Sequence, residues 1–239
     1  MKTLHIILIT LTSLSGCTKK AANVQAITNN TTTMTKPDSL NYLALGDSYT
    51  IGEAVPPSQS YPYQLTASLN RQSLNVGVPK IIAVTGWTTD NLIGATAQSG
   101  VTTKKYDFVT LLIGVNDQYQ GLSIDNYKIK FAQVLNTAIS FANGDTSRVF
   151  VLSIPDYGVT PFANGQGAVI GPEIDKFNAI NKSISLAVSV NYLDITPISR
   201  TAATDPTLIA PDGLHPSGKM YTQWMNLLEP MVAAKCVTP

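Results

Sequence analysis

Four short polar segments of this sequence contain side chains that could carry out covalent chemistry. They are Gly46–Tyr49, Thr85–Trp87, Gly114–Asp117 and Pro211–Pro216. Together they offer a serine hydroxyl, a backbone amide beside a glycine, a carboxamide, a carboxylate and an imidazole. These groups are the components of nucleophilic acyl transfer with an oxyanion hole.

Histidine is scarce, which singles out one residue as the candidate general base. The sequence has two histidines, and His5 lies in a predicted leader that would be removed. His215 would then be the sole imidazole, the side chain whose ordinary pKa suits a general base near neutral pH. Asp212 lies three residues earlier, close enough on a turn to hold the ring and fix its tautomer. The alternative is that His215 is a structural or surface residue.

Ser48 is the candidate nucleophile because it follows an apolar run. Tyr42–Leu45 has the pattern of a buried strand in a parallel sheet, and Gly46 ends it. A serine just beyond such a strand lies where open α/β sheets keep their ligand crevice. Asp and Ser also favour turns and helix caps, so the alternative is that Ser48 only closes a turn.

Strand-like and helix-like segments alternate along the chain, and this pattern predicts βαβ units with a parallel sheet. The expected strands are Tyr42–Leu45, Ile81–Val84, Phe108–Ile113, Val149–Ile154 and Val190–Asp194. The expected helices are Tyr61–Gln72, Thr89–Ala97, Ile124–Phe141, Glu173–Val188 and Lys219–Ala233, with Pro172 and Pro216 at helix starts. Right-handed crossovers place helices on both faces of about five strands. The four polar segments should therefore converge at one edge of the sheet.

The Gly- and Pro-rich connection Pro155–Pro172 is long for a compact domain, and such loops are often functional. Asp47 and Asp117 could form a carboxylate pair, but we expect them to accept hydrogen bonds from nearby loop backbone. Trp87 and Tyr49 either line an acyl pocket or are core aromatic residues.

The four segments resemble the four blocks of the SGNH (GDSL) hydrolase family and stand in that family's order. The matching residues are Gly46–Tyr49, Gly86, Gly114–Asp117 and Asp212–His215. The resemblance implies a flavodoxin-like three-layer α/β/α fold and ester hydrolysis without a metal or cofactor. Tyr49 stands where the family usually has leucine, a change outside the catalytic set.

The resemblance also implies a role for each matching residue. Ser48 would be the nucleophile, His215 the base and Asp212 the residue that orients it. The oxyanion hole would consist of the Ser48 and Gly86 amides and the Asn116 side chain. The chain would then be a serine esterase that acts through an acyl-enzyme intermediate. Its substrates would be either short acyl (acetyl) esters or lipid esters.

Other functions fit the sequence less well. A standard α/β-hydrolase needs Gly-x-Ser-x-Gly, but Thr50 stands at the second glycine. A flavin or nucleotide binder would use the Gly46–Thr50 loop for phosphate and would leave Asn116, Asp212 and His215 unexplained. A catalytically inactive glycan- or ligand-binding module on the same fold is the remaining alternative, although such a module should have lost a triad residue.

The N-terminal residues predict export and anchoring. Lys2 and the apolar stretch Leu4–Leu14 form a signal peptide over residues 1–16, too short to span a bilayer with margin. Leu14–Cys17 resembles the lipobox of bacterial lipoproteins, in which Cys17 is lipidated; the alternative is an ordinary secretory peptide. We expect residues 17–39 to be a flexible tether and 40–239 the hydrolase domain.

Composition and cysteine count limit the partners. The 239 residues carry 16 basic and 15 acidic side chains. This balance lacks the excess of positive charge that is typical of proteins that bind nucleic acids. With Cys17 lipidated, Cys236 has no disulfide partner. We therefore expect a monomeric enzyme in the bacterial cell envelope, held at a membrane by its lipid and facing the periplasm or the exterior. Its partner would be a small-molecule or polysaccharide ester.

Overall fold

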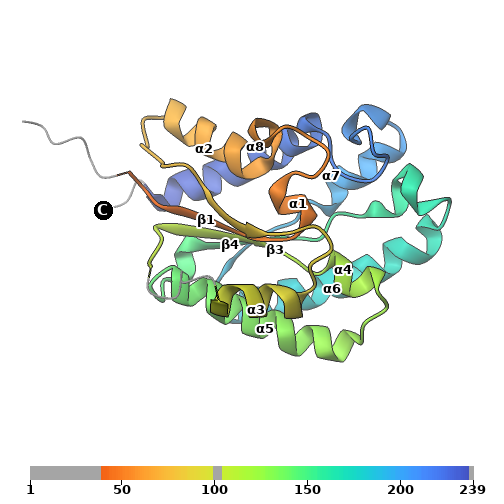
Figure 1. Ribbon diagram of the computed structural model, residues 1–239, viewed down its shortest axis with the longest axis horizontal. Coiled ribbons are helices and arrows are strands. Elements are labelled where there is room, and N and C mark those ends of the chain that lie inside the picture. The colour runs from red at the N-terminus through yellow and green to blue at the C-terminus, as the bar shows by residue number, and fades with distance from the viewer. Residues whose placement is uncertain (1–38, 99–103, 237–239) are drawn as a thin grey trace, which may run out of the picture. The chain divides into compact units, whose positions relative to one another are not determined.

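A five-stranded parallel sheet forms the centre of the computed structural model, which describes residues 39–98 and 104–236 (Figure 1). The strands are β1 (Tyr42–Gly46), β2 (Lys80–Ala83), β3 (Phe108–Leu112), β4 (Val149–Leu152) and β5 (Asn191–Leu193). Their spatial order is β2-β1-β3-β4-β5, and every neighbouring pair is parallel. This is the flavodoxin-like order, so the predicted fold class is confirmed.

The helices cover both faces of the sheet. They are α1 (Ser48–Ile51), α2 (Tyr61–Arg71), α3 (Thr89–Gln98), α4 (Val115–Tyr119), α5 (Ile124–Phe141), α6 (Gly167–Ala187), α7 (Thr196–Arg200) and α8 (Gly218–Cys236). Short 3₁₀ turns are η1 (Pro57–Gln59), η3 (Thr146–Arg148), η4 (Tyr157–Val159), η5 (Pro161–Ala163), η6 (Thr201–Ala203) and η7 (Pro206–Leu208). Figure 1 shows α2 and α8 on one face and α3, α5 and α6 on the other.

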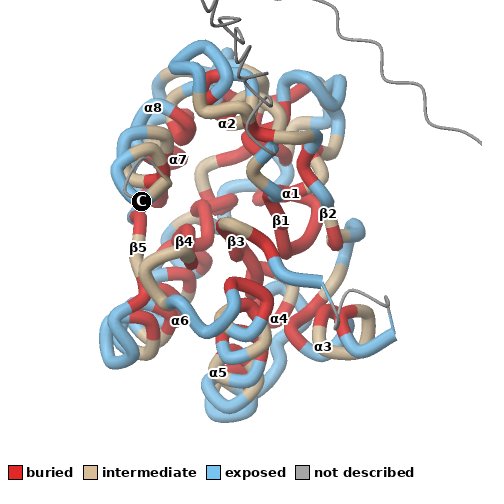
Figure 2. The backbone as a smooth tube through the Cα atoms, turned by 90° about the vertical axis from the view of Figure 1, so that its left-hand side faces the viewer, coloured by how far each residue is buried: buried red, intermediate tan, exposed pale blue. Residues whose placement is uncertain are grey.

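The three central strands are buried along their whole length. Every residue of β1, β3 and β4 is buried, and Figure 2 shows these strands as buried segments between the helices. Because both faces of the sheet are covered, these strands are apolar throughout rather than alternating. The unbroken apolar runs that predicted the strands are therefore a direct consequence of the three-layer packing.

One predicted element boundary is wrong. We expected a helix from Glu173 with Pro172 at its start, but α6 begins at Gly167 and Pro172 lies inside it. The first turn forms because the Gln166 carbonyl accepts hydrogen bonds from the amides of Val169 and Ile170. Ile170 is buried in the core, so packing stabilises a first turn that the glycine and proline content disfavours. The other predicted strands and helices match the observed ones within about three residues at each end, as is usual for such boundaries. The short helices α1, α4 and α7 and the 3₁₀ turns were not predicted.

The predicted signal peptide, the lipidation site Cys17 and all of the tether but Ser39 lie outside the described residues. Within the described part of the chain, Leu40 pairs with Val76 at the start of the sheet. No helix in residues 39–98 and 104–236 is long and apolar enough to cross a membrane. The expected boundaries of the N-terminal segments stay predictions.

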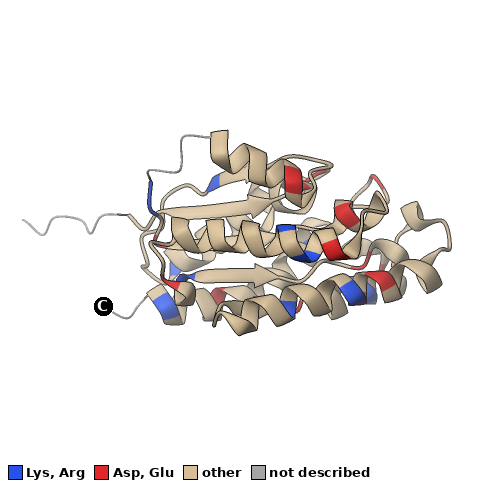
Figure 3. Cartoon of the chain, turned by 90° about the horizontal axis from the view of Figure 1, so that it is seen from below, with Lys and Arg blue, Asp and Glu red and all other residues tan. Residues whose placement is uncertain are grey.

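Charged residues are few, and both signs are mixed. In Figure 3 both acidic and basic positions are scattered along the helices on the face seen from below. One exposed ion pair links α3 to α5, with 2.6 Å between Asp90 Oδ1 and Lys130 Nζ. Exposed pairs of this kind contribute little to stability, so the fold depends on its apolar core.

Candidate active site

The strand order creates a crevice at the carboxyl ends of β1 and β3. The chain leaves β1 toward α2 on one face of the sheet and leaves β3 toward α5 on the other, which makes this pair of strands a topological switch point. A cavity of about 120 Å³ lies there. It is lined by Ser48, Tyr49, Thr85, Gly86, Val115, Asn116, Tyr119, Tyr157, Phe162, Leu214 and His215.

Ser48 enters the cavity at the start of α1. Gly46 ends β1, and a Cβ atom there would clash with the carbonyl oxygen of Leu112 and the side chain of Thr50, so glycine is required. Asp47 is the N-cap of α1, and Ser48 is its first residue. The first amides of a helix have no intrahelical acceptor, so the serine and its own amide are presented together at the strand end.

Asp47 is fully buried beneath the nucleophile candidate. Its Oδ1 accepts a hydrogen bond of 3.0 Å from the amide of Tyr49, as expected for a residue that braces the loop. Its Oδ2 is buried and has no hydrogen-bond partner among the described residues. Burial raises the pKa of Asp47 to about 8, with the charge of nearby Asp117 acting in the same direction and the hydrogen bond from Tyr49 opposing it. The carboxyl is therefore neutral over most of the range below pH 8.

His215 is held by Asp212 in a compact turn. The distance between His215 Nδ1 and Asp212 Oδ2 is 2.5 Å. Asp212 Oδ1 accepts hydrogen bonds of 3.0 Å from the amides of Leu214 and His215. Partial burial acts to raise the pKa of Asp212, but these hydrogen bonds outweigh it and lower the pKa below its ordinary value. A charged carboxylate thus faces Nδ1, which leaves Nε2 as the ring nitrogen able to accept a proton.

The Asn116 side chain is oriented from the loop after β2. Its Nδ2 donates a hydrogen bond of 3.0 Å to the carbonyl of Trp87. An amide nitrogen carries two hydrogens, so one remains for a ligand in the cavity. Gly86, which also lines the cavity, has a φ of +83°, a conformation that favours glycine.

Asp117, the next residue of α4, is also bonded to the segment that follows β2. Its Oδ2 accepts a hydrogen bond of 2.9 Å from the Thr89 amide, and its Oδ1 accepts one of 2.6 Å from the Thr89 hydroxyl. These bonds confirm the expectation that Asp117 binds loop backbone, here at the start of α3. Together with the bond from Asn116 to Trp87, they tie the loop after β2 to the start of α4.

The structure brings every predicted site residue of the folded domain to this one cavity. Ser48, Gly86, Asn116 and His215 line it, and Asp212 contacts it through His215. Tyr49 and Trp87, which were expected either to line an acyl pocket or to be core residues, differ in their positions. Tyr49 is both a core residue and part of the cavity wall, whereas Trp87 packs against the core and is not among the lining residues.

Sequence reasoning missed the aromatic side of the cavity. Tyr119, Tyr157 and Phe162 line it together with Leu214. Tyr119 follows Asn116 by three residues on α4 and so lies on the same helix face, a spacing that could have signalled it. Tyr157 and Phe162 come from the long connection after β4, which was expected to be functional without its residues being identified.

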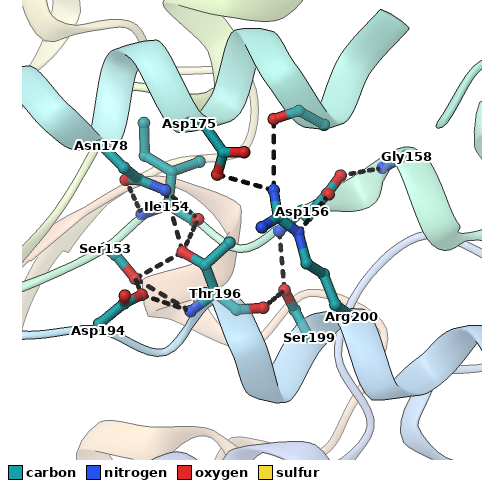
Figure 4. Close-up of polar contacts among 11 residues, drawn as sticks. Ser153, Ile154, Asp156, Gly158, Asp175, Asn178, Asp194, Thr196, Ser199 and Arg200 are labelled. Carbon is teal, nitrogen blue, oxygen red and sulfur yellow. Dashed lines mark hydrogen bonds and ion pairs between the residues drawn. The ribbon is translucent and has the colours of Figure 1, made fainter. Parts of the chain in front are cut away.

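An ion pair anchors the start of that connection (Figure 4). Asp156 Oδ2 lies 2.9 Å from Arg200 Nε, and Arg200 Nη2 lies 2.8 Å from Asp175 Oδ1. Asp156 Oδ1 accepts a hydrogen bond from the Gly158 amide, and the Asp156 amide donates one to Ser199 Oγ. Asp156 is only 5% exposed, so these partners take the place of the water that its carboxylate loses on burial.

The end of β4 is fixed by a second set of buried bonds, also visible in Figure 4. Asn178 accepts a hydrogen bond of 2.7 Å from the Ile154 amide and donates one of 2.9 Å to the Ile154 carbonyl. The hydroxyls of Ser153 and Thr196 lie 2.8 Å apart and link β4 to the start of α7. The connection to Tyr157 therefore begins from a rigid support.

Within residues 39–98 and 104–236, no three His, Cys, Asp or Glu side chains are grouped as metal ligands would be. Cys236, at the end of α8, is a free thiol packed against the core. Burial raises the pKa of this thiol.

A family model described as the GDSL-like lipase/acylhydrolase family matches residues 44–223, a range that contains all four sequence blocks. No curated protein matches the sequence.

Several solved structures share the fold. The crystal structure of TesA superposes with a TM-score of 0.65 at 15% identity, covering 82% of this chain and 99% of that one. The esterase EstA from Pseudoalteromonas sp. gives 0.63 at 14% identity, covering 82% and 98%. A variant of Axe2, an acetyl xylan esterase from Geobacillus stearothermophilus, gives 0.61 at 18% identity, covering 85% and 97%.

Proposed function

Because the chain belongs to the GDSL-like lipase/acylhydrolase family and is a carboxylic ester hydrolase, we propose that it is a serine esterase using Ser48, His215 and Asp212. One observation carries this proposal. The Asp212-held imidazole of His215 lines the same 120 Å³ cavity as the Ser48 hydroxyl, with Gly86 and Asn116 in its wall. Nucleophile, base and anion-stabilising donors are then within one enclosure.

The proposed reaction has two stages. Ser48 Oγ attacks the ester carbonyl carbon while His215 Nε2 takes the hydroxyl proton, and the carbonyl oxygen becomes an oxyanion. His215 then returns that proton to the leaving alkoxide, which departs as an alcohol and leaves Ser48 acylated. A water molecule repeats the same steps, releasing the acid and restoring Ser48.

The oxyanion would be stabilised by the amides of Ser48 and Gly86 and by Asn116 Nδ2. The hydrogen bond from Asn116 to the Trp87 carbonyl fixes the carboxamide before substrate binds, so no reorganisation is needed as charge develops. Asp212 keeps the His215 tautomer that frees Nε2 and stabilises the imidazolium formed during attack. Substrates are either short acyl (acetyl) esters or lipid esters.

A serine-directed phosphonate tests this assignment, since the similar esterase EstA was solved inhibited by monoethylphosphonate. Mass spectrometry of the treated protein should find one adduct, on Ser48, with a parallel loss of ester hydrolysis. The Ser48→Ala variant should form no adduct, whereas Ser58→Ala, at an exposed serine in η1, should react like wild type. An adduct at another serine would refute the nucleophile. A protein that forms no adduct and hydrolyses no ester would be an inactive binding module.

We also propose that Cys17 is lipidated and anchors the enzyme in the cell envelope. The lipobox-like Leu14–Cys17 and the polar segment that follows support this proposal. Expression in bacteria with labelled palmitate should place label in the membrane-bound protein, and Cys17→Ser should abolish both label and membrane association. Label retained in Cys17→Ser would exclude this anchor, whereas Cys236→Ser serves as the matched control.

A further inference from the structure

Glu53 is bonded to the backbone of the candidate nucleophile. It lies two residues beyond the end of α1, and its amide donates a hydrogen bond of 3.1 Å to the carbonyl of Ser48. The Gly52 amide donates a second bond of 3.1 Å to the same carbonyl. Such bonds close the carboxyl end of a helix. In this short helix they fix Glu53 directly to the residue whose amide is assigned to the oxyanion hole.

The side chain of Glu53 reaches the loop that holds the second backbone donor. Its carboxylate accepts a hydrogen bond from the hydroxyl of Thr85. Hydrogen bonds to a charged acceptor are stronger than neutral ones. Thr85 lines the catalytic cavity together with Gly86, the next residue. Glu53 thus connects the two backbone amides of the oxyanion hole, through its own amide on one side and through its carboxylate on the other.

Packing does little to hold the loop after β2 (residues 84–88) at the position of Gly86. Val84 is 47% exposed, and Thr85 and Gly86 are exposed as well. A Cβ atom built on Gly86 would meet no heavy atom of the described chain within 4 Å, apart from those of its neighbours in sequence. Glycine also leaves the backbone free to adopt many conformations. Hydrogen bonds must therefore decide where the Gly86 amide points.

These hydrogen bonds reach the loop after β2 from two sides. On the α4 side, Asn116 Nδ2 donates to the Trp87 carbonyl at 3.0 Å. The backbone ladder between β1 and β2 stops before the loop begins. On the α1 side, in the part of the chain that the structure describes, the bond from Thr85 to Glu53 is the only side-chain hydrogen bond or ion pair that joins the loop to residues 47–55. This one bond therefore relates the loop to the helix of the nucleophile.

On the basis of the proposed esterase function, we propose that Glu53 is a positioning residue for the oxyanion hole. Its bond to Thr85 holds the Gly86 amide where it and the Ser48 amide can donate to the same oxyanion. Glu53 is not among the residues that line the cavity, so it acts through Thr85. Both stages of the reaction form an oxyanion, and the bond therefore acts on acylation and on hydrolysis of the acyl-enzyme alike.

This role needs a hydrogen-bond acceptor at position 53 and not a negative charge. A glutamine side chain keeps a carbonyl oxygen that can accept the hydrogen of the Thr85 hydroxyl. It also removes a charge that would oppose an oxyanion nearby. Glu53→Gln should therefore recover most of the rate that Glu53→Ala loses.

The test measures kcat and KM for phenyl acetate, with active sites counted by complete phosphonate labelling of Ser48. Glu53→Ala should lower kcat about 10- to 100-fold, less than the loss of a whole oxyanion donor, and should change KM less than about twofold. Thr85→Val keeps the shape of the side chain, removes the hydroxyl and should cause a similar loss. The double variant should be no slower than the slower single variant, because both changes break the same bond.

Glu229→Ala is the matched control. Glu229, on α8, is half-buried like Glu53 and accepts a hydrogen bond from a side chain of another element, that of Gln72 on α2. Neither Glu229 nor Gln72 lines the cavity. Glu229→Ala should therefore leave kcat per active site unchanged, even where Tm falls.

Three results would overturn the positioning role. They are a kcat per active site within about twofold of wild type in Glu53→Ala, losses of the single variants that multiply in the double variant, and a Glu53→Gln variant as slow as Glu53→Ala. A lower Tm with an unchanged kcat belongs to the first of these and would show that Glu53 only stabilises the fold. None of them affects the esterase assignment. That assignment fails if wild type hydrolyses no ester and forms no adduct on Ser48.

Discussion

Replacement of the buried Asp47 by asparagine should change how stability depends on pH. The wild-type carboxyl has no partner for Oδ2 among the described residues and a pKa raised by burial from 3.8 to about 8. Between these pH values the folded state keeps a proton that the unfolded chain has released. The stabilisation by this group is therefore complete below about pH 4 and is lost as the pH rises toward 8. Asparagine is neutral throughout and can still accept the hydrogen bond from the Tyr49 amide.

The size of the effect follows from the linkage relation. Each pH unit within this window changes the free energy of unfolding by about 1.4 kcal/mol. From pH 5 to pH 7 wild type should lose about 3 kcal/mol relative to Asp47→Asn. For a domain of this size that difference shifts Tm by about 6–12 °C.

Thermal unfolding followed by circular dichroism at pH 5, 6 and 7 provides the assay. The Tm of Asp47→Asn minus that of wild type should rise steadily across the series. Asp125→Asn makes the same chemical change at an exposed position in the first turn of α5 and should run parallel to wild type. Parallel curves for Asp47→Asn and wild type would show that Asp47 is ionised in the folded protein, and the reasoning from burial would be wrong.

Three further substitutions test the site. Asn116→Ala should lower kcat by about 10²–10³ with KM nearly unchanged, and an unstable variant that keeps its rate per folded molecule would contradict the oxyanion role. Asp212→Asn should lower kcat by about 10³–10⁴ because His215 Nδ1 loses its charged acceptor. A kcat near that of wild type would show that Asp212 does not orient His215. Arg200→Ala should reduce the free energy of unfolding in urea by about 2 kcal/mol, with partial recovery in Arg200→Lys; an unchanged midpoint would mean that the pair with Asp156 is not needed.

The sequence by itself determined the sheet and the convergence of the polar segments. Buried parallel strands are apolar throughout, so Tyr42–Leu45 and the other runs were recognisable without knowledge of their neighbours. Since parallel strands end at one edge, the segments that hold Ser48, Asn116 and His215 could be assigned to one site from their order alone. The contact between Asp212 and His215 is local to one turn and was also predictable.

Only the tertiary structure decided how large the cavity is and what surrounds it. Phe162 lines the cavity from a connection whose start is paired with Arg200, 44 residues from Asp156, and the Phe162 amide bonds to Gly213, 51 residues away. The helical first turn before Pro172 and the raised pKa of Asp47 likewise depend on burial among side chains from other elements. The periodicity of apolar residues indicates whether a segment is a strand or a helix and which of its faces is buried. It carries no information on contacts between distant loops, and those contacts set the shape of the site.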